Sequence, residues 1–376
     1  MKIPFNKPYL SGKETQYITD AAVSGRISGN GPFTQKCHDF FEQRFDFKKV
    51  LLTTSCTDAL EMAALLSGIE AGDEVILPSY TFVSTATAFA LRGAKLIFAD
   101  VEPNYPNIDI DHIEQLITPK TKVIIVVHYC GVAVQMDRVM ELSKKHNLFV
   151  VEDAAHAIDS YYKGKALGSF GHVATFSFHE TKNIISGEGG LLVINDDDLI
   201  KRAEILWEKG TNRVAFSRGE VDEYCWKDLG SSYLASDLTA AFLYAQLENL
   251  DKIQERRKAV WNSYFNQLSD LHNKEIISLP EIPDYAMQNG NFFFFDVQNQ
   301  NTRDRLLKHL ANDGYQAVFH YLPLHSSDYF KDKYQGKLLN HTLRFSQTIV
   351  RLPFYVELSL ADIKKICKSV KSFFNH

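Results

Sequence analysis

The sequence predicts an α/β fold, with a large domain built on a mainly parallel sheet and a smaller α+β domain at the C-terminal end. The chain has 376 residues, which is too long for one small domain and suits two. From about residue 50 to about residue 200, short β-rich runs alternate with helical patterns, which is typical of a parallel sheet covered by helices. Past about residue 235, long helical stretches replace this alternation.

Six short runs are expected to form the strands of the large domain. Four are nearly continuous apolar runs, as parallel strands buried on both faces should be. They are residues 73–78, 94–101, 123–129 and 148–155. Residues 174–179 and 189–196 add two strand candidates, and residues 136–147 have the pattern of an intervening helix.

The C-terminal part begins with a helical stretch at 236–268, which predicts one long helix or two consecutive helices. It would lead to a smaller domain that carries a strand at 291–298. We place the boundary near residue 250. The large domain is then 1–250, with an N-terminal arm at about 1–30, and the small domain is 251–376.

Composition excludes several classes of function. The formal charge of −5 gives no electrostatic footprint for nucleic acid, and no dense basic run suggests a membrane surface. The N-terminal residues lack the apolar core of a secretory signal, and no apolar stretch is long enough to span a bilayer. Five scattered cysteines without CxxC spacing indicate reduced thiols in the cytoplasm and no metal site.

Residues 51–66 place small hydroxyl side chains directly before an amphipathic helix. Thr57 or Asp58 could simply cap this helix. The alternative is an anion site, because free N–H groups at a helix start, beside hydroxyl groups, bind phosphate.

Two further segments place chemical groups after predicted strands. Glu152 and Asp153 end one strand, where ligands of open parallel sheets bind, and His156 follows three residues after Asp153. The alternative is that a carboxylate caps the next helix. Tyr80 and Phe82 follow another strand, and either ring could stack on a planar ligand or pack in the core.

Lys182 lies between a strand-like run and the glycine turn at 187–190. A loop lysine is ordinarily a solvated charge. Combined with a phosphate site, an acid and an aromatic ring in this order, however, it fits pyridoxal 5′-phosphate (PLP). PLP needs a lysine for covalent attachment, an acid at its pyridine nitrogen and a cradle for its phosphate.

Several segments together resemble the DegT/DnrJ/EryC1/StrS sugar aminotransferases. The most specific are EDAAHA and FSFHETKNIISGEGG, with TTSCTDALEMAALL and GDEVILPSYTFVSTATA upstream, and the resemblance extends from IPFNKP to RLPFY. It implies the PLP-dependent, aspartate aminotransferase-like fold (fold type I) and a homodimer with shared active sites. Sugar dehydratases on the same fold carry histidine where this chain has Lys182, and a non-catalytic protein would not need that lysine.

Within the family, GNGPFTQKC, EKGTNR and VFHYLPLH look most like the enterobacterial common antigen branch. That resemblance implies transfer of the amino group of L-glutamate to C4 of dTDP-4-dehydro-6-deoxy-D-glucose. The product would be dTDP-4-amino-4,6-dideoxy-D-galactose. Amination at C3 of the isomeric keto sugar, or formation of the gluco epimer, are the alternatives that the sequence leaves open.

The resemblance also implies roles for single residues. Lys182 would be the Schiff-base lysine and proton shuttle, and Asp153 would pair with the pyridine nitrogen. Phe82 would stack on the ring, and His156 would lie near its phenolic oxygen. The phosphate would be held by Ser55, Cys56, Thr57 and Ser177.

The chain departs from the family pattern at two positions. Leu234 stands where many members carry an asparagine that reaches the cofactor phosphate of the neighbouring subunit, so Ser231 or Ser232 is expected to replace it. Position 156 is often glutamine in the favoured branch. The residues expected near the sugar nucleotide are His320, Tyr321, His325, Lys209 and Arg213. Lys209 and Arg213 would reach it across a dimer interface, or they are solvated surface charges.

Overall fold

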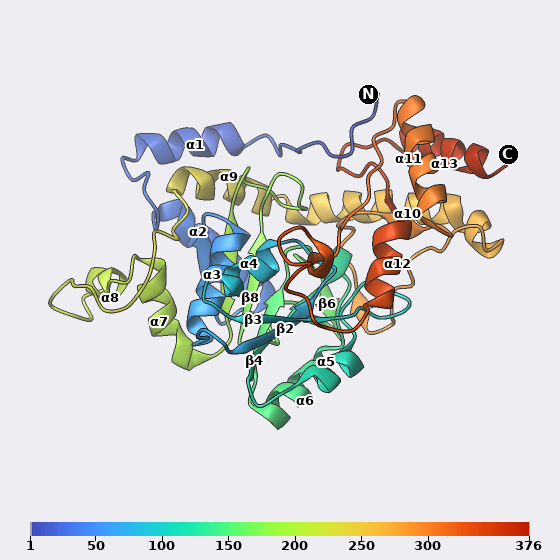
Figure 1. Cartoon of the computed structure of the whole chain (residues 1–376). Coiled ribbons are helices and arrows are strands. Elements are labelled where there is room, and N and C mark those ends of the chain that lie inside the picture. The colour runs from blue at the N-terminus through green and yellow to red at the C-terminus, as the bar shows by residue number, and fades with distance from the viewer. Residues whose placement is uncertain (1, 376) are drawn as a thin grey trace.

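The computed structural model of the chain describes residues 2–375. Its centre is a seven-stranded sheet in the order β1-β9-β8-β5-β4-β2-β3, with helices on both faces (Figure 1). β9 runs antiparallel to β1 and β8, and the remaining adjacent pairs are parallel. The strands are β1 (Lys49–Thr53), β2 (Glu74–Pro78), β3 (Lys95–Ala99), β4 (Thr121–Val127), β5 (Phe149–Asp153), β8 (Val173–Ser177) and β9 (Gly190–Ile194).

This sheet confirms the predicted fold class and all six predicted strands. β1, which directly precedes the hydroxyl-rich segment, was not predicted. Val50 and Leu52 of β1 face one side of the sheet and Leu51 faces the other, because successive strand side chains point to opposite faces. β1 is thus buried on both sides, like the strands that were recognised.

Helices of two groups cover the two faces of the sheet. The first face packs against α2 (Pro32–Phe45), α5 (Ile110–Leu116), α6 (Met136–His146) and α9 (Asp237–Leu247). The second face packs against α3 (Cys56–Leu66), α4 (Ser84–Ala90) and α7 (Asp197–Trp207). α1 (Glu14–Val23) packs on α9, and α8 (Arg213–Ser217) is a short surface helix.

The stretch that was expected to form one or two helices forms two. α9 ends at Leu247 and α10 (Leu250–Asn273) begins almost at once. α10 leads to a second hydrophobic core with a two-stranded sheet, in which the predicted strand at 291–298 is reduced to three residues. The elements of this part are β11 (Phe294–Asp296), α11 (Gln300–Asn312), α12 (Asn340–Thr348), β12 (Ile349–Arg351) and α13 (Leu360–Phe374).

The chain start lies on the C-terminal part, where the N- and C-terminal segments are close together (Figure 1). Ile3 forms a β-bridge with Tyr315 and is buried in the second core. A small sheet of β6 (Tyr161–Tyr162), β7 (Lys165–Ala166) and β10 (Ala286–Met287) also joins segments from both parts. A domain boundary near residue 250 stays a prediction.

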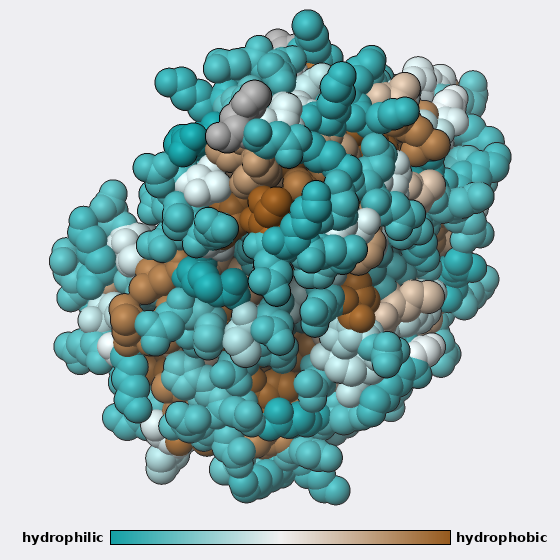
Figure 2. Space-filling model, turned by 90° about the vertical axis from the view of Figure 1, so that its right-hand side faces the viewer, coloured by the Kyte–Doolittle hydropathy of each residue, from teal (hydrophilic) through white to brown (hydrophobic). Residues whose placement is uncertain are grey.

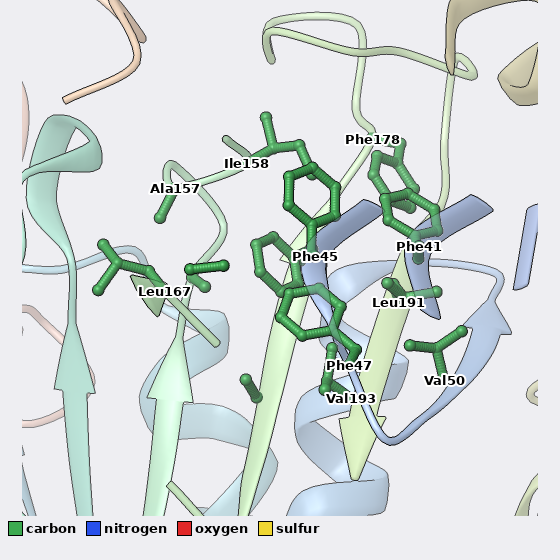
Figure 3. Packing of buried hydrophobic residues seen from close by; sticks show 14 of the residues in the cluster. Phe41, Phe45, Phe47, Val50, Ala157, Ile158, Leu167, Phe178, Leu191 and Val193 are labelled. Carbon is green, nitrogen blue, oxygen red and sulfur yellow. The ribbon is translucent and has the colours of Figure 1, made fainter. Parts of the chain in front are cut away.

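Aromatic packing fixes the beginning of the loop that carries Lys182. Phe178, directly after β8, is fully buried and stacks on Phe41 of α2 with ring centroids 5.5 Å apart. Phe45 and Phe47 extend this cluster beneath the loop (Figure 3). The loop therefore starts from a rigid position in the core.

The surface in Figure 2 is mainly hydrophilic, with apolar side chains visible in hollows between polar ones. Among residues 2–375, no helix has the length and apolar character that crossing a membrane requires.

Candidate active site

The carboxyl ends of the parallel strands meet at one edge of the sheet, and a cavity of about 890 Å³ opens there. The loop from β8 to β9 crosses the same edge. The fold therefore brings most of the predicted site residues together. Those that line the cavity are Ser55, Cys56, Thr57, Phe82, Asp153, His156, Ser177, Lys182, His320 and Tyr321.

The start of α3 forms the polar floor of one end of the cavity. Ser55 is the N-cap, and its Oγ accepts a hydrogen bond of 3.1 Å from the N–H of Asp58, so the expectation that Thr57 or Asp58 caps the helix was wrong. The N–H groups of Cys56 and Thr57 lie in the first turn and have no carbonyl partner within the helix. The Thr57 hydroxyl lies 2.7 Å from that of Ser84.

Gly190 allows β9 to lie against this helix start. A Cβ at this position would overlap the peptide between Ser55 and Cys56. The close approach that Gly190 permits is therefore to the start of α3.

Asp153, at the end of β5, is buried and faces the cavity. Its Oδ2 accepts a hydrogen bond of 2.7 Å from the hydroxyl of Thr85, and its Oδ1 accepts one of 3.2 Å from the N–H of Ala155. Burial raises the pKa of Asp153, and the Thr85 hydrogen bond opposes this rise because it stabilises the carboxylate. Neither oxygen forms an ion pair with a cation among residues 2–375, so the carboxylate is available to a cationic group of a ligand.

His156 is buried on the cavity wall as a neutral imidazole. Burial lowers its pKa well below the ordinary value. Nδ1 accepts a hydrogen bond of 3.4 Å from the N–H of Cys130, which leaves the ring proton on Nε2. Nε2 lies 3.4 Å from the hydroxyl of Tyr321 and can donate to an oxygen in the cavity.

Lys182 reaches the cavity from the loop between β8 and β9. Burial lowers the pKa of its amine from an ordinary value of 10.5 to about 8. With a pKa of about 8, about a tenth of the amine is uncharged at pH 7, and a nucleophile or a proton acceptor must be uncharged.

Two aromatic residues after β2 behave differently. Phe82 is 58% exposed at the mouth of the cavity, with its ring 6.4 Å from that of Tyr321. Tyr80 is fully buried, and its hydroxyl donates to the carbonyl oxygen of His320, so Tyr80 packs in the core. Phe82 is thus the ring that is free to stack on a planar ligand.

Arg351, at the end of β12, lines the cavity and was not predicted as a site residue. Its side chain is buried, its Nε has no hydrogen-bond partner among the described residues, and its Nη1 donates to Nδ1 of His320 at 2.9 Å. Burial and the Arg351 charge lower the pKa of His320 to about 4, so His320 is a neutral acceptor. The sequence showed only that RLPFY belongs to the family pattern, because the burial of a lone arginine depends on tertiary contacts.

The remaining predicted residues lie outside the cavity. His325 is buried, with Nδ1 2.7 Å from the Ser79 hydroxyl. Lys209 and Arg213 are exposed and both contact Glu208, at 3.2 and 3.4 Å. The exposed residues Ser231 and Ser232 belong to the same surface region as these two.

The polar groups that line the cavity fit PLP. A helix start with free N–H groups suits a phosphate, a buried carboxylate without a cation suits a protonated ring nitrogen, and a lysine of lowered pKa suits covalent attachment. Within residues 2–375, no cluster of three or more His, Cys, Asp or Glu side chains is arranged to hold a metal ion.

Comparisons with known proteins agree with this chemistry. Residues 8–371 match the DegT/DnrJ/EryC1/StrS aminotransferase family. GDP-perosamine synthase of Escherichia coli O157:H7 is 32% identical over 377 residues, covering 99% of both chains. Spore coat polysaccharide biosynthesis protein SpsC of Bacillus subtilis (strain 168) is 30% identical, covering 98% of this chain and 96% of its own. The PLP form of Spr1654 from Streptococcus pneumoniae is 25% identical with a TM-score of 0.90, covering 100% of this chain and 99% of its own.

Proposed function

Because this chain belongs to the DegT/DnrJ/EryC1/StrS aminotransferase family, we propose that it aminates C4 of dTDP-4-dehydro-6-deoxy-D-glucose with L-glutamate as donor. The chain is a PLP-dependent nucleotide-sugar aminotransferase. The galacto-configured 4-amino sugar is the proposed product. The sugar, the position of amination and the donor are the parts that we propose.

The observation that carries the proposal is that Lys182 and Asp153 line the same cavity. Lys182 is the only lysine among the described residues that line it. Asp153 raises the pKa of Lys182 and Lys182 lowers that of Asp153, so the two side chains interact electrostatically across the cavity. A lysine here, rather than the histidine of related dehydratases, favours amino transfer over elimination.

Lys182 has two proposed roles. Its Nζ would attach PLP, and when Nζ is not bound to the cofactor, the amine would carry the proton that leaves the Cα of the amino donor. The bound cofactor supplies an electron sink that stabilises the carbanion formed at that carbon. The lowered pKa of Lys182, about 8, keeps part of the amine ready to accept the proton near neutral pH.

The other polar groups hold and orient the cofactor in this proposal. Asp153 stabilises the positive charge on the pyridine nitrogen, and His156 donates from Nε2 toward the phenolic oxygen. Phe82 covers the ring. The phosphate is held by the N–H groups at the start of α3 and by the hydroxyls of Ser55, Thr57 and Ser177.

Arg351 is the proposed site for a carboxylate of the amino donor. Its guanidinium lies in the cavity wall between Phe292, 3.6 Å from the ring centroid, and Phe5, and it contacts a neutral histidine rather than an acid. A buried cation without an anionic partner is costly. The planar guanidinium is suited to bind a carboxylate through two parallel hydrogen bonds.

In this proposal, the predicted site residues that lie outside the cavity act in the cavity of a second copy of the chain. Lys209, Arg213, Ser231 and Ser232 would reach the cavity of a homodimer partner. An exposed apolar side chain on the same surface segment supports a subunit interface here, because Trp226 is 78% exposed.

We also propose that the enzyme is cytoplasmic, since all five of its cysteines are free.

A GDP-linked keto sugar is a second candidate substrate, because a relative described as GDP-perosamine synthase aligns along almost the whole chain. Amination at C3, or an equatorial amine at C4, are further candidates. Each would use the same cofactor site. They differ in how the sugar lies over it.

A product assay tests the proposal. The protein is mixed with PLP, L-glutamate and dTDP-4-dehydro-6-deoxy-D-glucose, and the proton couplings of the product are read by NMR. We expect an axial amine at C4. An equatorial amine would overturn the configuration only, and an absence of amination by PLP-loaded protein would direct the assay to the 3-keto isomer and to GDP-linked sugars.

A further inference from the structure

A network of buried amide side chains lies directly behind Lys182. Asn183, the next residue, is 3% exposed, and its Nδ2 donates to Gln254 Oε1 at 2.9 Å and to the backbone oxygen of Asn289 at 3.0 Å. Its Oδ1 accepts from Nδ2 of Asn291 at 2.7 Å. One side chain thus connects the Lys182 loop to α10 and to the segment 289–291.

The backbone partners determine how each amide is oriented. Asn183 must present its NH₂ group to the Asn289 carbonyl, because that oxygen only accepts. Gln254 must present Nε2 to the carbonyl of Ile158, 3.3 Å away, which leaves Oε1 for Asn183. The amide of Asn289 donates to the carbonyls of His156 and Ile158, at 2.8 and 2.7 Å. Every orientation is therefore consistent with the others.

The network also joins the segments that carry two site residues. Lys182 precedes Asn183, and His156 is held through its carbonyl by Asn289. Close packing fixes the segment between Asn289 and Asn291, because a Cβ at Gly290 would contact the backbone of Arg257 on α10. A buried guanidinium, Arg257, donates to the carbonyls of Gly290 and Asn291.

We propose that Asn183 is a positioning residue, which holds the Lys182 backbone through Gln254, Asn289 and Asn291 so that the amine stays in the cavity. The loop from Phe178 to Gly189 has no regular secondary structure. Phe178 anchors its start in the core, and Asn183 anchors it directly beside the lysine. This inference rests on the proposed role of Lys182 as the lysine that binds PLP.

Loss of the anchor would let Lys182 move toward solvent and regain hydration. Since burial is the main cause of the lowered pKa of Lys182, its pKa would then rise from about 8 toward 10.5. A role of Asn183 in stability alone would lower the melting temperature and leave this pKa unchanged.

The test measures the pKa of Lys182 in cofactor-free protein. Competitive acetylation with acetic anhydride is carried out across pH, and the modification of the Lys182 peptide is quantified by mass spectrometry. We expect half-maximal modification near pH 8 in the unchanged protein. In Asn183→Ala it should move upward by about 0.5–1 pH unit, and Gln254→Leu should move it in the same direction by less.

Gln246→Leu is the matched control. Gln246 is as buried as Gln254, but it donates to the Tyr9 carbonyl and to Glu14 on α1 instead. We expect it to lower stability and to leave the Lys182 pKa unchanged. The inference is overturned if Gln246→Leu shifts the Lys182 pKa as much as the other variants do, or if neither Asn183→Ala nor Gln254→Leu shifts it. If Asn183→Ala does not fold, Gln254→Leu alone decides.

Borohydride reduction of PLP-loaded, unchanged protein separates this inference from the proposed function. If the reduced cofactor is found on a lysine other than Lys182, the proposed function fails with it. If it is found on Lys182 and the variants do not shift the pKa, only the positioning role of Asn183 fails.

Discussion

The cavity at the edge of the sheet and the surface segment 208–232 differ in how their polar groups are satisfied. In the cavity, Asp153 and His156 are buried, and each has specific partners from other elements. In the segment, Lys209 and Arg213 are exposed and share one acid, Glu208. One chain therefore brings the polar groups of the cavity together from several elements, whereas the two cations of the segment contact only an acid of their own segment. The difference separates residues that act within a subunit from those that we propose act across subunits.

The largest expected effect is at the centre of the cavity. Lys182→Ala removes both the attachment point for PLP and the proposed proton carrier, so we expect turnover to fall by about 10³-fold or more. Product formation with L-glutamate as donor measures it. Repeated turnover by this variant at a rate near that of the unchanged enzyme would contradict the role of Lys182.

A substitution at Arg351 tests whether the same cavity also binds the amino donor, L-glutamate. Arg351→Met keeps a long apolar side chain between the rings but loses the charge. We expect the KM for L-glutamate to rise by about 30- to 100-fold, which corresponds to the loss of one or two charge-assisted hydrogen bonds. The KM for the sugar nucleotide should stay the same, as steady-state kinetics with each substrate varied will show.

Arg344→Met is the control for this change, because Arg344 on α12 is a partly exposed arginine that pairs with Asp296. It should leave both KM values unchanged. If Arg351→Met raises the KM for the sugar nucleotide instead, Arg351 binds the pyrophosphate rather than the donor.

The two regions also differ in what the sequence could predict. Six strands were predictable because each is an apolar run, and Asp153 and the candidate phosphate site at the start of α3 follow from their places at strand and helix ends. The family motif directed attention to Lys182. By contrast, Thr85 and Asn183 were missed because an ordinary polar residue becomes important only through its partners, Asp153 and Gln254, which lie far away in the sequence.

Arg351 was missed for a related reason. Nothing in the sequence around it indicates that the fold buries this guanidinium beside a neutral histidine. Conversely, Lys209 and Arg213 were predicted near the substrate, but in one chain both are exposed and contact Glu208. Resemblance suggests which residues matter, whereas burial and partners show how they can act.

Mixed dimers test whether the surface segment serves a neighbouring cavity. Arg213→Ala alone should lower activity by about tenfold, through loss of a contact to the charged substrate. When it is mixed and refolded with Lys182→Ala, half of the dimers carry one variant of each kind. Each such dimer has one intact site, so activity should recover to about a quarter of the unchanged enzyme.

Separately folded samples of the two variants, combined only in the assay, are the control and should show no recovery beyond their sum. Absence of recovery after joint refolding would place Arg213 and Lys182 in the same subunit's site, or Arg213 outside any site.

The smallest expected effect concerns the fine tuning of Asp153. Thr85→Val keeps the shape of the side chain and removes the hydroxyl that donates to Oδ2. This hydrogen bond stabilises the carboxylate, so its loss raises the pKa of Asp153 beyond the rise that burial already causes. Activity that needs ionised Asp153 should then begin to fall at a higher pH, with the acid limb of kcat/KM displaced upward by about 0.5–1 unit. Near neutral pH the loss of activity should be only a few-fold, about 1 kcal/mol.

Thr87→Val is the control, because Thr87 is exposed on the same helix, and it should leave the pH profile unchanged. An acid limb that stays in place in Thr85→Val would mean that another group controls it, and that the cavity tolerates a carboxylate held by the N–H of Ala155 alone.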